Sequence, residues 1–196
     1  MTKSTQTAPT ERTPALIPSL DQVVPSAERQ LAVRHWLLSA LDETGRDRAR
    51  MEWDSHGCAF FRLGMRFAAV RFHARLVHGV AGTETLQGSN AYLADALGGG
   101  PVICDPYAWH YYALVLPSAV DHLNYPETRG KWGIEPLGRN TFLGVPRVER
   151  LGPQDDHASY WAVPMPSAGE LCEPDLVAQL LDEAVRRALA EPGPST

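Results

Sequence analysis

The sequence predicts a single α+β domain in which a mostly antiparallel sheet is packed against helices. Two long segments, 26–43 and 174–190, repeat apolar residues at the spacing of an amphipathic helix. Between them lie short apolar runs of strand length, each bounded by Gly, Pro or Asp. The 196 residues fit one domain, and 44% hydrophobic against 21% charged residues excludes a wholly disordered chain.

The two ends of the chain differ in composition from its centre. Residues 1–25 are rich in Pro, Thr and Ser and predict a flexible tail, and residues 191–196 predict a frayed end. No internal repeat or linker divides the part between them. We therefore expect one domain that spans residues 26–190.

Each of the two terminal helices has signals for its beginning or its end. Ser26 is a suitable N-cap for the first helix, and Thr44-Gly45 predicts its end after residue 43. Pro174 suits the first turn of the last helix, because that position needs no N–H group. The apolar stripes of both helices predict faces that pack into a core.

The middle of the chain predicts the sheet. Two apolar runs, 58–63 and 67–72, flank Gly64 and predict a β-hairpin. Helices are expected over 73–80 and 90–97, the second ended by three consecutive glycines. Further strands are expected over 102–104, 111–116, 141–145 and 159–163.

The cysteines and the N-terminus bear on the compartment. Cys58, Cys104 and Cys172 are odd in number and widely spaced, whereas an oxidised scaffold normally has more cysteines in an even number. The N-terminus lacks the apolar core of a secretory signal, and the longest apolar run, 111–116, is far shorter than the roughly 18 residues that a membrane span needs. We therefore expect a cytoplasmic protein with no membrane partner.

Charge is segregated along the chain although the net charge is only −5. Residues 46–75 hold seven arginines against three acids, a local charge of +4. Residues 149–191 hold three arginines against nine acids, a local charge of −6. The total excludes tight non-specific binding to nucleic acid, but a local anion-binding face remains possible.

Arginines near the expected hairpin predict such a face. Arginine has a planar fork that suits phosphates and bases, and four phenylalanines at 60, 61, 67 and 72 lie among these arginines. The alternative is that the phenylalanines face the core and the arginines form a solvated surface. The candidate contacts to an anion or a nucleic acid are Arg62, Arg66, Arg71, Arg75 and Arg139.

A second candidate site would hold a metal. Asp54, His56 and Cys58 alternate along the chain, so an extended backbone would place all three side chains on one face. These are metal-ligand types, and Asp105 is a fourth candidate ligand. The alternative is a loop that leads into a strand whose first buried residue is Cys58.

A third candidate is an aromatic surface formed by Trp109, Tyr111, Tyr112 and Trp132. Alternation along an expected strand predicts Trp109 and Tyr111 on one face and His110 and Tyr112 on the other. Core packing explains one of these faces. The other face is a candidate surface for a ligand or a partner.

Six stretches follow one another in an order that resembles the N-terminal domain family of bifunctional DNA primase/polymerase proteins (prim-pol), particularly its short stand-alone actinobacterial relatives. The stretches are Arg62-Leu-Gly-Met-Arg-Phe-Ala-Ala-Val-Arg71, Gly100-Pro-Val-Ile-Cys-Asp105, Tyr112-Ala-Leu-Val-Leu-Pro117, Leu137-Gly-Arg-Asn-Thr-Phe-Leu-Gly-Val-Pro146, Tyr160-Trp-Ala-Val-Pro164 and Gly169-Glu-Leu-Cys-Glu-Pro174. The resemblance implies an RRM-like sheet that carries the active site. It also implies relatives that copy or prime nucleic acid with two divalent metals, held by a D-x-D strand, a small-x-His strand and a further Asp.

The chain departs from this family pattern where the metals would bind. The strand that resembles the D-x-D strand runs from Phe67 to Arg71 and has no carboxylate. Asp105 and Asp121 each lack a paired acid nearby. The resemblance therefore carries over the fold and no catalytic residue, since two-metal chemistry needs clustered carboxylates.

Three functions follow as hypotheses. The first is a non-catalytic primase/polymerase-like domain that binds a nucleotide, single-stranded nucleic acid or a protein partner. The second is a metal-dependent nucleotidyl-transfer or hydrolytic enzyme with a rebuilt Asp/His/Cys site, the one hypothesis that requires a divalent metal cofactor. The third is a regulatory protein-interaction module. Convergence of Asp54, Asp105 and His110 would favour the second.

Overall fold

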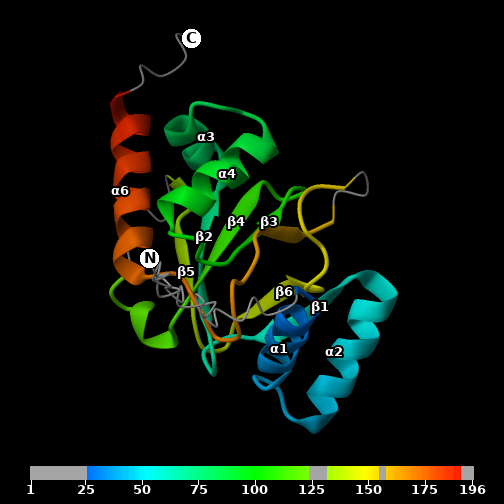
Figure 1. Cartoon of the computed structure of the whole chain (residues 1–196). Helices are drawn as coiled ribbons and strands as arrows, with labels where there is room; N and C mark the ends of the chain where they lie inside the picture. The colour runs from blue at the N-terminus through cyan, green and yellow to red at the C-terminus, as the bar shows by residue number, and fades with distance from the viewer. Residues whose placement is uncertain (1–25, 124–131, 155–157, 191–196) are drawn as a thin grey trace, which may run out of the picture.

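The main sheet has five strands in the order β5-β2-β4-β3-β7, and each neighbouring pair is antiparallel (Figure 1). The computed structural model describes residues 26–123, 132–154 and 158–190, so both predicted tails lie outside the described residues. The short edge strand β5 contains a proline, a residue that edge strands tolerate. The five strands are β2 (Ala68–His73), β3 (Val102–Asp105), β4 (His110–Val115), β5 (Glu135–Leu137) and β7 (Tyr160–Val163).

Two further strands, β1 (Cys58–Arg62) and β6 (Phe142–Pro146), form a separate antiparallel ribbon. The expected hairpin between the runs on either side of Gly64 is therefore wrong, because β1 pairs with β6 and β2 pairs with β4 and β5. Gly64 does turn the chain, with a φ of 92° and a hydrogen bond from its N–H to the Phe67 carbonyl at 2.8 Å. The turn passes the chain from one sheet to the other.

The expected first helix ends earlier than predicted, as α1 (Ser26–Leu38), and it is followed by a helix that the sequence did not predict, α2 (Glu43–His56). Asp42 caps α2, since its Oδ1 accepts a hydrogen bond from the Gly45 N–H at 2.8 Å. Gly45, predicted to end a helix, therefore lies in the first turn of the next one. Helix α2 buries only Gly45, Ala49 and Trp53, and two of these residues are small, so its apolar pattern in the sequence is weak.

Helices α3 (Ala74–Ala81), α4 (Leu86–Ala96) and α6 (Pro174–Ala190) confirm three predicted helices. The second begins four residues earlier than expected, because Thr85 caps it through the Gly88 N–H at 3.2 Å. Pro174 opens α6 as predicted, and this helix buries part of its apolar stripe. A short 3-10 helix, η1 (Pro117–Ala119), follows β4.

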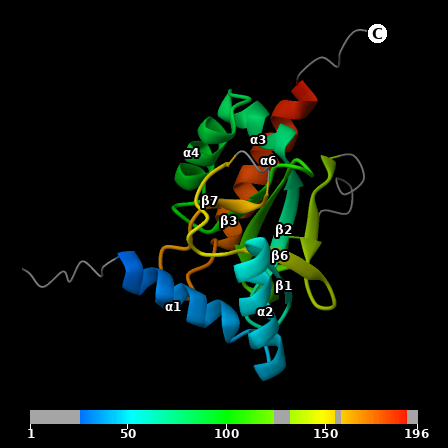
Figure 2. The same cartoon turned by 90° about the vertical axis from the view of Figure 1, so that its right-hand side faces the viewer.

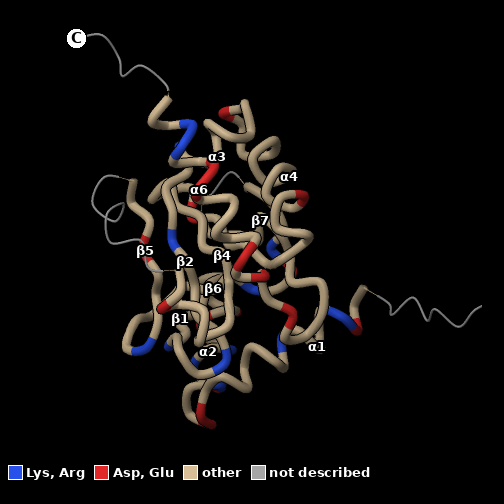
Figure 3. Tube along the Cα trace, turned by 90° about the vertical axis from the view of Figure 1, so that its left-hand side faces the viewer, with Lys and Arg blue, Asp and Glu red and all other residues tan. Residues whose placement is uncertain are grey.

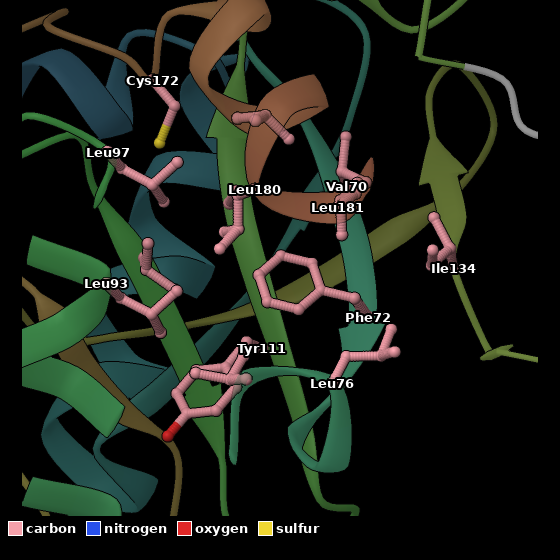
Figure 4. Packing of buried hydrophobic residues seen from close by; sticks show 14 of the residues in the cluster. Val70, Phe72, Leu76, Leu93, Leu97, Tyr111, Ile134, Cys172, Leu180 and Leu181 are labelled. Carbon is pink, nitrogen blue, oxygen red and sulfur yellow. The ribbon is translucent and has the colours of Figure 1, made fainter. Parts of the chain in front are cut away.

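Two hydrophobic cores lie on opposite faces of the five-stranded sheet. One core joins the sheet to α3, α4 and α6, and Figure 4 shows Leu93, Phe72, Tyr111 and Leu180 packed within it. The other joins the opposite face to α1, α2 and the β1–β6 ribbon, which Figure 2 shows apart from α3 and α4. The predicted α+β domain, with a mostly antiparallel sheet and packed helices, is confirmed, with five α-helices among the described residues. None of the described helices has the length and apolar character needed to cross a membrane.

Candidate functional site

The outward face of the β1–β6 ribbon exposes two phenylalanine rings. Along β1, Ala59 and Phe61 point into the core, whereas Phe60 is 58% exposed. On β6, Phe142 is 61% exposed and pairs in register with Arg62. Phe60 pairs with Gly144, one pleat along, so the two rings are diagonal neighbours on one face.

Three exposed arginines border these rings. Arg62 donates from Nη2 to the Asn140 Oδ1 at 2.6 Å, which ties β1 to the turn before β6. Gly64 lies against Arg139, where an added Cβ would be 2.5 Å from the Arg139 Cγ. Arg66 is exposed in the same turn as Gly64. None of the three arginines forms an ion pair with a carboxylate of the described residues.

We call this set the arginine–phenylalanine surface: Phe60, Arg62, Arg66, Arg139 and Phe142. Its residues come from β1, from β6 and from the turns that precede β2 and β6, and Figure 3 marks the basic positions along the trace around β1. Aromatic rings beside arginines that have no carboxylate partner in the described part of the chain offer the chemistry that binds stacked bases and phosphates. The surface is thus a candidate nucleic-acid interface.

Helix α2 holds the ribbon from its other side. The Glu52 Oε2 accepts a hydrogen bond from the Phe60 N–H at 3.0 Å, at the strand edge that faces away from β6. The buried Trp53 Nε1 donates to the Val145 carbonyl at 2.9 Å, and its ring packs 5.5 Å from that of Phe61. Two helix residues therefore bind both strands of the ribbon, which positions the exposed rings on a rigid support.

A second polar group crosses the five-stranded sheet. His73, His110 and Asp105 lie in register on β2, β4 and β3, with the two imidazole centroids 5.5 Å apart. One row along the same face, Arg71 pairs in register with Tyr112 and forms a 2.5 Å ion pair with a glutamate of β5. All these side chains are half-buried. We call His73, His110 and Asp105 the histidine row.

Burial and nearby cations set the charge of the histidine row. Burial, together with Arg75, lowers the pKa of His73 below its usual range. Burial, and to a smaller extent Arg71, lowers the pKa of His110. Both imidazoles are therefore neutral at neutral pH. In the same row, the Asp105 Oδ1 accepts hydrogen bonds from two backbone N–H groups of the turn before β4.

The structure brings together three of the five predicted anion contacts. Arg62, Arg66 and Arg139 belong to the arginine–phenylalanine surface. Arg71 instead faces the histidine row, where Glu135 pairs with it, and Arg75 is exposed at the start of α3.

The structure also separates the four phenylalanines that were predicted near the arginines into exposed and buried residues. Of the four phenylalanines among the predicted arginines, Phe60 is exposed and the other three are buried. The sequence analysis missed Phe142. Alternation along the expected strand 141–145 could have placed Phe142 and Gly144 on one face.

The predicted aromatic surface does not form. Tyr111 is buried, and its hydroxyl donates to the Asn90 Oδ1 at 3.2 Å. Trp132 is half-buried against the core under α3 and α6. Trp109 is exposed, but it precedes β4 with a φ of 57°, so strand alternation does not apply to it. Tyr112 is half-buried beside Arg71.

The predicted metal site does not form either. Asp54 and His56 lie on the last turn of α2 and not on an extended strand, and Asp54 lies 4.0 Å from the Arg34 guanidinium. Burial raises the pKa of Cys58 to about 11, so a neutral thiol dominates. Asp105 belongs to the histidine row. Within the described ranges, no three His, Cys, Asp or Glu side chains form a group that could hold a metal ion, so Asp54, Asp105 and His110 do not converge.

Comparison of this chain with protein-family models, with curated proteins and with solved structures finds no match. The resemblance to the primase/polymerase family therefore stays a prediction. Function has to be inferred from the chain's own residues, and the arginine–phenylalanine surface is the feature with the clearest chemical meaning.

Proposed function

We propose that this protein binds single-stranded nucleic acid through the arginine–phenylalanine surface. The observation that carries the proposal is the pair of phenylalanine rings, each more than half exposed, on a ribbon face bordered by three arginines without carboxylate partners in the described residues. Bases stack on aromatic rings, and arginine guanidinium groups bind the phosphates between them. Every base has a π face, so the binding is expected to tolerate many sequences.

The same chemistry favours a single strand over a duplex. Phe60 and Phe142 can stack only on bases that are unpaired and turned outward. A duplex offers this surface its phosphates alone, and the net charge of −5 disfavours binding held by bulk charge. We therefore expect a single strand to bind more tightly than a duplex of the same sequence.

A protein partner is the second candidate, because Phe60 and Phe142 are exposed apolar side chains of the ribbon and Met65 is exposed in the turn after β1. The unpaired arginines favour nucleic acid over this alternative. An apolar partner would bury Arg62 and Arg139 without a counter-charge, whereas a phosphate backbone supplies one at each step.

The test is fluorescence anisotropy of a labelled oligothymidylate of about 15 nucleotides with the full-length protein. Three phosphate contacts predict that log K falls with log salt at a slope of about −2. Arg62→Ala, Arg66→Ala and Arg139→Ala should each weaken binding and reduce that slope by about 0.7.

Arg75→Ala is the matched control, because it removes an exposed arginine of α3 away from the ribbon. It should leave the affinity and the slope unchanged. Absence of binding at about 50 mM salt would refute the proposal. Equal losses in Arg75→Ala and Arg62→Ala would refute the placement of the surface.

A further inference from the structure

His73 closes the N-terminus of α3. It lies at the end of β2, and its Nδ1 accepts a hydrogen bond from the Arg75 N–H at 3.1 Å. The acceptor must be an unprotonated Nδ1, so the neutral ring carries its proton on Nε2. An imidazolium has a proton on both nitrogens and cannot accept this bond.

The start of α3 is also joined to the turn between β3 and β4. The Ala74 N–H donates to the Trp109 carbonyl at 2.8 Å. Trp109 holds a positive φ of 57°, and its ring edge contacts His78 of α3 at a centroid distance of 6.1 Å. Helix α3 and this turn therefore meet at two places, a backbone hydrogen bond and a ring contact, and the His73 cap lies next to both.

Several basic side chains lie close to His73, and two of them are arginines. His110 faces it from β4, Arg71 lies one row along β2, and Arg75 and His78 lie on α3. In the described part of the loop before β5, Gly133 lies close to His73, since an added Cβ there would be 3.8 Å from the His73 Cβ. Among the described residues, three carboxylates of this region have other partners: Asp105 accepts from the turn before β4, Glu135 pairs with Arg71, and Glu84 acts on His78.

We propose that His73 is a pH-sensitive latch, which caps the start of α3 beside its contacts with the β3–β4 turn while the ring is neutral and releases this helix start when the ring is protonated. Protonation replaces an acceptor by a donor that faces the Arg75 N–H. It also places a positive charge beside His110, Arg75 and His78. The latch is independent of nucleic-acid binding, because the arginine–phenylalanine surface lies on other elements.

His78 works in the same direction. Its Nε2 is buried and has no hydrogen-bond partner among the described residues, so a proton there would create an unsatisfied buried charge. Burial lowers the pKa of His78; Glu84 opposes this shift, and the nearby His73 adds a smaller lowering. The open state, in which both rings meet water, binds protons more readily. The latch is therefore stable above about pH 6.5 and is lost as the pH falls through the lowered pKa of His73.

The test compares hydrogen-exchange protection of α3 in the full-length protein at about pH 7.5 and about pH 5. Loss of one N-cap predicts that α3 loses about fivefold or more of its protection factor at the lower pH, relative to α2 on the other face of the sheet. His73→Asn is the matched variant, since asparagine caps a helix but does not titrate in this range. At the lower pH its α3 should keep more of its protection than that of the wild type, because of these two histidines only His78 still titrates.

Two results would overturn the latch. One is wild-type α3 that keeps its protection at the lower pH, and the other is the same loss in His73→Asn. An NMR titration of the wild-type His73 ring gives a test that needs no variant. A midpoint below about 6.5 supports the latch, and a midpoint at or above that value overturns it.

Discussion

Replacing Phe142 by alanine should weaken binding of a single strand by a large factor. One stacked base contributes about 1–3 kcal/mol, which corresponds to about a 5- to 150-fold rise in Kd. Phe60→Ala should have an effect in the same range, because both rings face outward on one ribbon. The double variant should bind more weakly than either single variant.

The same changes should leave the domain folded. Phe142 is 61% exposed, so only about two-fifths of its surface is buried on folding. Full burial of a phenylalanine contributes roughly 1.5–3 kcal/mol, which gives a loss of about 1 kcal/mol for Phe142→Ala. Phe60→Ala should lose slightly more stability, because its ring lies beside Gly144, where an added Cβ would be 3.9 Å from the Phe60 Cε1.

The assay pairs anisotropy with urea unfolding of the same samples. Tyr107→Ala is the control, since it removes an aromatic ring that is 86% exposed in the β3–β4 turn. We expect it to bind as tightly as the wild type. Wild-type affinity in both phenylalanine variants, with their folding intact, would refute the stacking role. A loss of affinity in Tyr107→Ala as large as that in Phe142→Ala would refute the location of the binding surface on the ribbon.

Three further changes test the support of the surface. Gly64→Ala should lower the free energy of unfolding by roughly 2 kcal/mol or more, because the φ of Gly64 is 92° and an added Cβ would press on Arg139. The displaced Arg139 should also reduce the salt slope of nucleic-acid binding. Urea unfolding with wild-type stability would contradict this prediction. Trp53→Phe should lower stability by about 1–3 kcal/mol in the same assay, because the buried Val145 carbonyl loses its donor. The Cys58 thiol, with a pKa of about 11, should react with an aromatic disulfide about a hundredfold more slowly at about pH 8 than a free thiol does, and equal rates would contradict its burial.

Strong periodic patterns predicted most of the helices and strands. The apolar stripe that includes Val177 and Leu181 falls on one face only when this segment is helical, and α6 buries part of that stripe. The helix begins at Pro174 as expected. The runs 102–104 and 111–116 became β3 and β4 with small shifts at their ends. Burial of apolar side chains stabilises both the helix and these strands, and the periodic spacing of those side chains can be seen in the sequence.

Elements held by polar contacts were harder to predict. Helix α2 buries Gly45, Ala49 and Trp53, and its start depends on the Asp42 cap, so its composition resembles a solvated segment. The three-residue strand β5 is too short to show alternation. The Gly64 turn was predicted, but the sequence pattern does not show which strand pairs with which.

The residues of the candidate site were also hard to predict, because strand pairing brings them together. The arginines at 62 and 66 are close in sequence, but Arg139 and Phe142 join them only through the pairing of β1 with β6. The metal prediction assumed an extended backbone at Asp54 and His56, where the chain forms a helix. The sequence therefore predicted arginines near β1 and one of the two exposed rings, Phe60, and the pairing of β1 with β6 determines which other residues lie beside them.

The most direct test of the proposed function is an NMR titration of the full-length protein with oligothymidylate. Amide shift changes report where the strand lies without any substitution. We predict that the largest changes occur in residues 58–66 and 139–144, which contain the arginine–phenylalanine surface. Unchanged shifts in both segments when the strand is in excess, or larger changes around Tyr107 and Trp109, would contradict it.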